Sequence, residues 1–401
     1  MNPVPLLGSQ SGIPMGTSPL PDIRRSAVAG LMAAAFASGP VAAQLKPEPL
    51  TTAALPAASP HWVWVNDIVF HHMADGKAFL IDGNAGKMLG MLSTGFGFTG
   101  LKLVPDGSVI VSPETYFSRG TRGTRTDVVT LYDAKTLNFQ AEIGIPAKRA
   151  GQLPMTSTSG ITDDGRFLLV YNFTPAQTVS VVDLKSRKFV GEVDIPGCAE
   201  VYPTGPRSFF SLCGDGTAFQ VTLDETGKPA ARSRSAKFFD ALKDPVTEKG
   251  IRDGNTWLFA TFAGDMVPVE ATASGLKAQA RWPLSTPAER QQNWKPGGMQ
   301  HLAIHAKSRR LYSLMHQGGP DTHKDPGVEV WVHDLAAGGK KVQRIPLEKP
   351  LTSIAATSDA KPLLFGINIG IPELRVFDAM SGKLLRTVAE IGFTPSTLVT
   401  R

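Results

Sequence analysis

The sequence predicts an all-β protein: a seven-bladed β-propeller whose blades are four-stranded antiparallel sheets. Three observations support this fold class. A strand–turn–strand pattern occurs seven times, the acidic residues at its turns recur at similar intervals, and a second hairpin lies between successive copies. The composition agrees, because 40 Gly and 31 Pro in 401 residues favour short strands joined by turns over long helices.

The repeated pattern is clearest between residues 119 and 143. Val128–Tyr132 is rich in β-branched and aromatic residues, Asp133–Thr136 has turn residues, and Asn138–Ile143 completes the hairpin. The turn acids of the seven copies are Asp82, Asp133, Asp183, Asp224, Glu270, Asp334 and Asp378. Neighbouring turn acids are 41–51 residues apart, except for an interval of 64 residues before Asp334.

A second hairpin precedes this pattern in most repeats. It occurs at residues 101–111, 161–171, 201–212, 301–314 and 354–366. Two hairpins per repeat give four antiparallel strands in about 40–50 residues, which is the spacing of a propeller blade. We therefore expect residues 61–401 to form the propeller.

The two ends of this region indicate how the ring closes. Trp62–Asp67 matches the second strand of the other blades, so the first blade lacks its innermost strand. Pro395–Thr400 is a strand without a repeat of its own. We expect the two segments to pair within one blade, which closes the ring and removes two open sheet edges.

The long interval before Asp334 predicts an insertion with a short helix. Thr286 suits the N-cap, Pro287 suits the first helical position, and Glu289 completes a capping box. The Lys-Pro-Gly-Gly run at residues 295–298 is expected to end the helix.

Residues 1–43 are predicted to be a signal peptide. An arginine pair at 24–25 precedes the apolar run Ala27–Ala37, and small residues lead to a cleavage site after Ala43. The run is too short to span a bilayer, so no membrane span is expected after cleavage. The leader is long for a general secretory signal, so either translation starts at Met15 or the arginine pair belongs to a twin-arginine signal.

The mature product is then secreted, and periplasmic in a Gram-negative host. Residues 44–60, rich in Pro and Ala, are expected to form an extended N-terminal arm. The predicted mature chain contains two cysteines, Cys198 and Cys213. In an oxidising compartment two cysteines at this spacing most simply form one disulfide, and the alternative is a pair of buried thiols.

The charge pattern excludes one class of partner. The formal net charge of +6 is spread along the chain, without a basic helix or an aromatic–basic ladder. Nucleic-acid binding is therefore not expected. A mild positive excess serves solubility or favours an acidic protein partner.

No motif in the chain specifies a catalytic or metal site by itself. Gly95–Gly100 matches G-x-G-x-x-G, but a dinucleotide site needs a helix directly afterwards, and another strand is expected here. His301 and His305 would share a strand face about 13 Å apart, without a suitably spaced third ligand, so no metal site is predicted. No nucleophile motif stands out.

Four segments resemble the heavy subunit of the quinoprotein amine dehydrogenases, which are the methylamine and aromatic amine dehydrogenases. These segments are SRGTRGTRTDVV at 118–129, the stretch from Cys198 to the Cys-Gly-Asp-Gly run at 213–216, NWKPGG at 293–298 and GPDTHK at 319–324. The resemblance extends from Trp62 to Val399. The arginine run and the paired cysteines are its more specific features, because generic propellers lack both.

This resemblance implies a seven-bladed propeller in a periplasmic α2β2 heterotetramer. The small, cysteine-rich light subunit of such an enzyme carries tryptophan tryptophylquinone and the catalytic aspartate, so neither a catalytic residue nor a bound cofactor is expected on the present chain. Primary amines are oxidised to aldehyde and ammonia, and electrons pass to a small copper protein of the cupredoxin type. The present chain would seat the light subunit and complete the substrate channel.

The resemblance also suggests a channel residue. Phe96, which follows a Ser-Thr-Gly run, matches the phenylalanine that lines the channel in the family, and Phe98 is the second choice. The alternative is a phenylalanine that only packs between blades.

A charged segment around Arg119, Arg122 and Arg125 is absent from the other repeats. We expect it to contact another subunit, and the alternative is a solvated basic loop. The alternative function for the whole chain is a stand-alone secreted propeller that acts as a binding module or a lactonase-like hydrolase.

Overall fold

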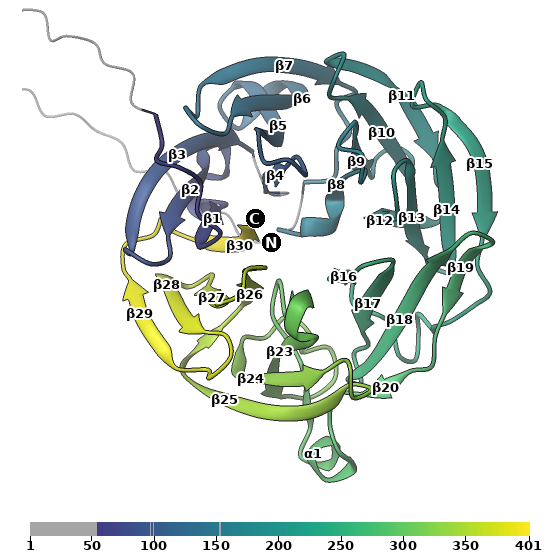
Figure 1. The fold of residues 1–401 in the computed structure, drawn as a ribbon. Coiled ribbons are helices and arrows are strands. Elements are labelled where there is room, and N and C mark those ends of the chain that lie inside the picture. The colour runs from purple at the N-terminus through teal and green to yellow at the C-terminus, as the bar shows by residue number, and fades with distance from the viewer. Residues whose placement is uncertain (1–53, 97, 99, 152–153) are drawn as a thin grey trace, which may run out of the picture. The chain divides into compact units, whose positions relative to one another are not determined.

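The computed structural model describes residues 54–401, apart from residues 97, 99, 152 and 153. In this region seven antiparallel sheets follow one another around a ring (Figure 1), which confirms the predicted seven-bladed propeller. The predicted signal peptide and residues 44–53 of the predicted arm lie outside the described residues. Residues 54–60 contain no helix or strand, and the Leu55 amide donates a hydrogen bond to the Lys135 carbonyl.

Blades 1 to 4 contain four strands each. The strands of each blade are given from the centre of the ring outwards. Blade 1 contains β30 (Pro395–Thr400), β1 (Trp62–Asp67), β2 (Gly76–Asp82) and β3 (Lys87–Gly95). Blade 2 contains β4 (Lys102–Leu103), β5 (Val109–Arg119), β6 (Arg122–Asp133) and β7 (Phe139–Ile145). Blade 3 contains β8 (Ser159–Ile161), β9 (Phe167–Asn172), β10 (Thr178–Asp183) and β11 (Lys188–Asp194). Blade 4 contains β12 (Cys198–Pro203), β13 (Ser208–Cys213), β14 (Ala218–Leu223) and β15 (Pro229–Arg234).

Two of the remaining three blades carry a fifth, short strand. Blade 5 contains β16 (Ile251–Asp253), β17 (Thr256–Ala260), β18 (Asp265–Thr272) and β19 (Gly275–Ala278), with β20 (Trp282–Pro283) also on β18. Blade 6 contains β21 (Trp294–Pro296) and β22 (Leu302–His305), both on β23 (Arg310–Gln317), then β24 (Gly327–Asp334) and β25 (Lys340–Leu351). Blade 7 contains β26 (Ser353–Ala356), β27 (Leu363–Asn368), β28 (Ile371–Asp378) and β29 (Leu384–Val388). The helices are α1 (Pro287–Gln291) and the 3₁₀ turns η1 (Phe70–Asp75), η2 (Thr156–Thr158) and η3 (Ala306–Ser308).

An acidic residue at the end of the third strand of a blade fixes the outer turn. In blade 2, Oδ1 of Asp133 accepts hydrogen bonds from the Lys135 and Thr136 amides at 2.9 and 2.8 Å. A turn is stabilised when a side chain accepts a hydrogen bond from the backbone amide two residues further along the chain. This explains why the acidic residues recur regularly. The same contact to a following amide is made by Asp82, Asp183, Asp224, Asp334 and Asp378.

The predicted turn near Glu270 is wrong. Glu270 lies inside β18, opposite Lys277 of β19, and the chain reverses at residues 273 and 274. Gly275 has φ 121°, which a side chain would disfavour, and this glycine allows the tight reversal.

The predicted helix is present but shorter than expected. The Thr286 hydroxyl accepts the Glu289 amide and the Glu289 carboxylate accepts the Thr286 amide, which is the capping box the sequence indicated. The helix ends at Gln291, because Asn293 adopts φ 62° and the next residues form β21. In Figure 1, α1 projects outward from the ring.

The ring closes as predicted, because β30 becomes the innermost strand of blade 1 (Figure 1). β30 runs antiparallel to β1 and places Leu398 opposite Val65. The Asn66 amide group donates to the Thr397 hydroxyl at 3.1 Å. The two ends of the propeller therefore share one sheet.

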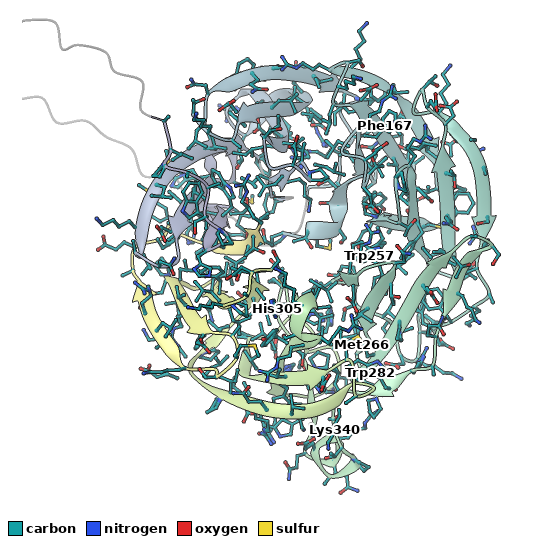
Figure 2. The ribbon with its side chains drawn as sticks, in the orientation of Figure 1. Phe167, Trp257, Met266, Trp282, His305 and Lys340 are labelled. Carbon is teal, nitrogen blue, oxygen red and sulfur yellow. A yellow bond between two sulfur atoms is a disulfide. The ribbon has the colours of Figure 1, made fainter. Side chains whose placement is uncertain are left out.

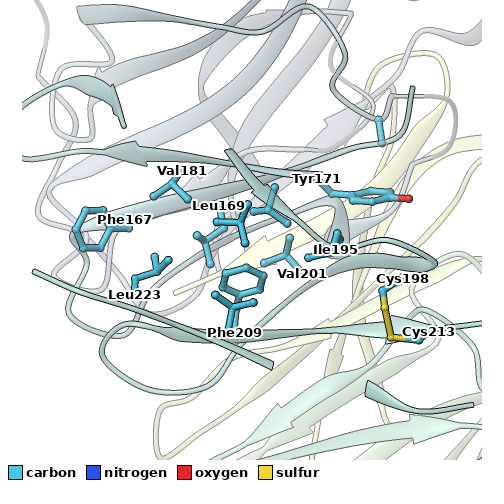
Figure 3. Packing of buried hydrophobic residues seen from close by; sticks show 14 residues of the cluster. Phe167, Leu169, Tyr171, Val181, Ile195, Cys198, Val201, Phe209, Cys213 and Leu223 are labelled. Atoms are coloured by element: carbon cyan, nitrogen blue, oxygen red, sulfur yellow. A yellow bond between two sulfur atoms is a disulfide. The ribbon is translucent and has the colours of Figure 1, made fainter. Parts of the chain in front are cut away.

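The hydrophobic core lies between neighbouring blades. Between blades 3 and 4, Phe167 and Leu169 pack in one cluster with Phe209 from the facing sheet (Figure 3). Strands that are buried on both faces require apolar residues at successive positions, which agrees with the five consecutive buried residues Phe167–Tyr171 of β9.

The strands of one blade also differ in position along its radius. Figure 2 shows His305 on the central side of blade 6 and Lys340 at its outer edge.

Among residues 54–401 as described, no helix has the length and apolar character needed to cross a membrane.

Candidate functional site

The two predicted channel residues lie on one cavity beside blades 1 and 2, which we call the Phe96 cavity. Its volume is about 310 Å³. The walls come from η1, from the connection between β3 and β4, from the β5–β6 hairpin and from the segment after β7. The lining residues are Met73, Phe96, Phe98, Thr115, Phe117, Arg125, Arg149 and Gly151.

Three phenylalanines form the apolar side of the Phe96 cavity. The ring of Phe96 lies 5.4 Å from that of Phe98 and 5.9 Å, edge-on, from that of Phe117. Aromatic rings at these separations attract one another. Phe98 is 4% exposed, whereas Phe96 is half-buried. A ligand in the cavity would therefore meet more of Phe96 than of Phe98.

The predicted basic segment is a β-hairpin and not a loop. β5 and β6 stay paired beyond the body of blade 2, through Phe117 opposite Arg125 to Arg119 opposite Arg122. Gly120 lies at the turn with φ 70°. β5 and β6 contain 11 and 12 residues, so the hairpin extends beyond the rest of blade 2.

The three predicted contact arginines have different environments. Arg119 and Arg122 are exposed at the tip of the hairpin. Arg125 is engaged within the chain: its Nε and Nη2 donate to Oδ1 and Oδ2 of Asp127 at 2.8 and 2.7 Å. The structure thus brings Arg125 to the Phe96 cavity and leaves Arg119 and Arg122 outside it.

Asp127 is a buried carboxylate with four hydrogen-bond donors. Besides Arg125, the Thr115 hydroxyl and the Arg149 amide donate to it, both at 2.8 Å. Asp127 is only 1% exposed, so these bonds offset the cost of removing a charge from water. The carboxylate thereby holds together the hairpin and the segment that follows β7.

Arg149 links this carboxylate to the channel residue. Its Nε and Nη2 donate to the Thr115 hydroxyl at 3.1 and 2.9 Å, and Nη2 also donates to the Phe96 carbonyl at 2.5 Å. Burial lowers the pKa of Arg149 to about 10, although the Asp127 charge opposes this shift. The guanidinium therefore stays protonated at neutral pH.

The Phe96 cavity offers apolar walls and two guanidinium groups, and among the described residues that line it none carries a carboxylate or an imidazole. Glu114 is close in sequence but projects from the other face of β5, where the Thr130 and Tyr116 hydroxyls donate to it. Burial raises the pKa of Glu114. The cavity can bind and orient the apolar part of a ligand.

The predicted disulfide is confirmed, and the alternative of two buried thiols is wrong. Cys198 and Cys213 face each other directly across β12 and β13 and are bonded. They belong to the core cluster between blades 3 and 4 (Figure 3), and neither is among the described residues that line the Phe96 cavity.

The two histidines that were considered as metal ligands, His301 and His305, have structural partners. His301 Nε2 lies 3.3 Å from the Thr247 hydroxyl, and His305 contacts the Ser308 hydroxyl and the Asp359 carbonyl at 2.7 and 2.8 Å. Burial lowers the pKa of His301, which keeps it neutral. Within the described part of the chain, no group of three or more His, Cys, Asp or Glu is placed to hold a metal ion.

Two further cavities contain neither predicted channel residue. The larger, about 500 Å³, lies at the opposite end of β5 and is walled by residues 55–58 together with Trp62 and Trp64. The smaller, about 240 Å³, contains Glu200 and Glu248. Burial, followed by the Glu248 charge, raises the pKa of Glu200 to about 8.

Sequence reasoning missed several residues of the Phe96 cavity. Thr115 and Phe117 are two positions apart on β5 and so share a face, a pattern that the strand prediction contained in principle. Met73 and Arg149 come from connections between strands and follow no period. Only the folded ring brings them to Phe96.

Solved structures show the same fold at low identity. The Dihydro-heme d1 dehydrogenase structure has a TM-score of 0.52 at 18% identity and covers 86% of this chain and 68% of that chain. A candidate 6-phosphogluconolactonase from Bacteroides uniformis has a TM-score of 0.58 at 12% identity and covers 85% and 99%. Identities this low show the fold alone, so the lactonase-like alternative gains no support.

Sequence relatives are more informative. The family described as Methylamine dehydrogenase heavy chain (MADH) matches residues 60–401. The Methylamine dehydrogenase heavy chain of Methylophilus methylotrophus is 32% identical over 360 residues, which cover 89% of this chain and 87% of the relative. That of Paracoccus versutus is 32% identical over 346 residues, which cover 86% and 80%. This chain belongs to the methylamine dehydrogenase heavy chain family.

Proposed function

We propose that this chain is the large, cofactor-free subunit of a periplasmic amine dehydrogenase. The complex oxidises a primary amine with water to an aldehyde and ammonia, and releases two electrons and two protons. The electrons pass to a cupredoxin-type acceptor. The observation that carries this proposal is the family match over residues 60–401, which spans all seven blades.

The partner is a small, cysteine-rich light subunit in an α2β2 heterotetramer. That subunit holds tryptophan tryptophylquinone, which accepts the electrons, and the catalytic aspartate. The Phe96 cavity suits this division of labour, because its phenylalanine and methionine side chains offer apolar walls to the organic part of a substrate.

The Phe96 cavity is the part of the substrate channel that this chain provides. The guanidinium groups of Arg125 and Arg149 disfavour an ammonium group inside it, since like charges repel strongly where water is scarce. The phenylalanine rings favour an apolar substituent. An amine therefore enters with its substituent against Phe96 and its amino group towards the light subunit.

The surface beside the Phe96 cavity is the proposed seat of the light subunit. Phe70 and Phe393 are 60% and 72% exposed. Their segments are adjacent, because the Phe70 amide donates to the Thr394 hydroxyl at 2.8 Å. Phe70 begins η1, which also contributes Met73 to the cavity. Exposed aromatic side chains of this kind are typical anchors of protein interfaces.

Co-expression tests this function. The full chain is produced with and without the small cysteine-rich partner, and amine-dependent dye reduction and quinone absorbance are measured. Activity should appear only in the complex. Failure of the two chains to associate, or turnover of a substrate by the large chain alone, would contradict the proposal.

Replacement of Phe96 should change the amine preference of the complex. In Phe96→Ala the wall recedes, so the ratio of kcat/KM for 2-phenylethylamine to that for methylamine should rise by at least about tenfold, which is the lower end of the effect of one methylene in an apolar pocket. Phe139→Ala, on the exposed outer strand β7, is the matched control. Unaltered kinetics across amines of different size in Phe96→Ala would remove Phe96 from the channel.

The tip of the β5–β6 hairpin should contribute an electrostatic contact to the light subunit. Arg119→Ala/Arg122→Ala should lower the association rate several-fold at low salt, because exposed charges act mainly on encounter. The difference should fade near 0.5 M salt, where the Debye length is only a few ångströms. Arg187→Ala/Lys188→Ala removes the same charge from exposed positions where the chain enters β11 of blade 3, and serves as control. Equal salt dependence in both double variants would argue against the contact.

A further inference from the structure

The backbone of Phe96 is held at both of its polar atoms. Its amide donates to the Thr115 carbonyl at 3.0 Å, and its carbonyl accepts from Nη2 of Arg149 at 2.5 Å. The preceding Gly95 is packed so tightly that an added Cβ would lie 2.7 Å from the Tyr116 ring. One side of Phe96 is thus fixed by β5, and its carbonyl is bonded by a side chain from another segment.

Arg149 is a rigid support for this contact. Its segment is tied to blade 3, since the Ala150 amide donates to the Tyr171 carbonyl and the Phe173 amide to the Lys148 carbonyl. Its own amide donates to Asp127. The side chain is 1% exposed. A buried arginine whose backbone and side chain are both bonded has little freedom to move.

The hairpin arginine reinforces the same support. Nη2 of Arg125 donates to the Arg149 carbonyl at 2.7 Å, in addition to its two bonds to Asp127. A continuous set of hydrogen bonds therefore runs from Arg125 at the base of the hairpin, through Asp127 and Thr115, to Arg149 and Phe96.

The chemistry of arginine suits this position. The planar guanidinium presents several donors in a fixed fork, so Arg149 bonds the Thr115 hydroxyl and the Phe96 carbonyl at once. A lysine has its donors on a single atom at the end of a flexible stem and would not hold both acceptors in the same geometry.

We propose that Arg149 is a positioning residue that holds Phe96 at the wall of the cavity and thereby sets the amine preference of the complex. This inference rests on the proposed function of the chain and on the channel role of Phe96. It assigns to Arg149 no contact with the reacting atoms.

The experiment uses the complex reconstituted with the light subunit and a series of methylamine, butylamine and 2-phenylethylamine. Arg149→Met removes the guanidinium but leaves Asp127 its bonds from Arg125, Thr115 and the backbone. Without the hydrogen bond from Arg149 to its carbonyl, Phe96 should be able to move away from larger substituents. The ratio of kcat/KM for 2-phenylethylamine to that for methylamine should therefore rise at least about threefold, in the same direction as in Phe96→Ala. Arg149→Lys should fall between the wild type and Arg149→Met.

The double variant separates positioning from a general loss of structure. If Arg149 acts through Phe96, Arg149→Met should leave the ratio unchanged in a Phe96→Ala background, so that the two effects do not add. Arg375→Met removes another buried arginine, from β28 in blade 7, and should leave the ratio at its wild-type value.

The outcomes distinguish the positioning role of Arg149 from the channel role of Phe96 and from the proposed function. If Phe96→Ala shifts the ratio and Arg149→Met does not, or if the two shifts add in full, the positioning role of Arg149 is wrong while the proposed function stands. If Phe96→Ala is itself silent in an active complex, the channel role of Phe96 is wrong and the inference falls with it. If the reconstituted wild type does not oxidise amines, the proposed function fails.

Discussion

Deletion of residues 395–401 is expected to unfold the whole propeller and not only to loosen blade 1. The deletion removes β30 and with it Leu398, which is 2% exposed in the core cluster beside blade 7. Burial of such a side chain contributes about 2 kcal/mol. β30 also bonds other blades: the Gln300 side chain contacts the Leu398 amide and carbonyl, the Ser353 hydroxyl donates to the Ser396 carbonyl, and the Thr400 hydroxyl donates to the Ala356 carbonyl.

Four such bonds at about 1 kcal/mol each bring the expected loss to about 6 kcal/mol, which is comparable to the whole free energy of unfolding of a typical domain. Urea unfolding followed by circular dichroism measures the effect. The truncated chain should show either no cooperative transition or a much lower midpoint. Deletion of Arg401 alone, which leaves β30 complete, is the control. A truncated chain that melts as the full chain does would show that the ring does not depend on this closure.

Removal of the Cys198–Cys213 disulfide is expected to cost about 3 kcal/mol of stability. The bond closes a loop of 15 residues in sequence, and the chain-entropy argument assigns about 3 kcal/mol to a loop of that length. Both cysteines also belong to the core cluster between blades 3 and 4, so their loss affects two blades and not one hairpin.

Two forms of the chain separate the contribution of the covalent bond to stability from the contribution of side-chain packing. Reduction of the wild-type chain breaks the bond and keeps both sulfur atoms, whereas Cys198→Ala/Cys213→Ala also removes the sulfurs. Both forms should lose about 3 kcal/mol in urea unfolding, the alanine variant somewhat more. A loss below about 1 kcal/mol in the reduced chain would show that the disulfide is not a main source of stability here.

The architecture could be predicted because each blade repeats local chemistry. The turn aspartates bond amides two or three residues further on, so their recurrence in the sequence reports a local structure. Where the acidic residue does not lie at the turn, the prediction was wrong: Glu270 lies within β18, and Gly275, further along the chain, allows the reversal. Helix α1 begins where the sequence predicted, because its capping box is a local feature. It ends earlier than predicted because β21 pairs with β23, and this contact between distant residues could not be foreseen from the local sequence.

The candidate site could be predicted only in outline. Phe96 was indicated by a family resemblance, and the structure places it on a cavity together with Phe98 and Arg125. The role of Arg125 could not be read from its charge, because the nearby Arg119 and Arg122 carry the same charge and are exposed. The difference is the bidentate contact of Arg125 with Asp127, two positions along β6, and the hydrogen bond that Arg125 donates to the Arg149 carbonyl.

The number of blades and the pairing of the two ends could be predicted from the sequence, because both follow from periodic patterns. For Cys198 and Cys213 the sequence left either one disulfide or two buried thiols. The residues that surround Phe96 became known only from the folded chain. Arg149 is 53 residues away along the chain and reaches the Phe96 carbonyl from the segment after β7. A bond between a side chain and a distant backbone atom leaves no pattern in the sequence, because any residue type presents the same carbonyl, so it exists only once neighbouring blades have packed.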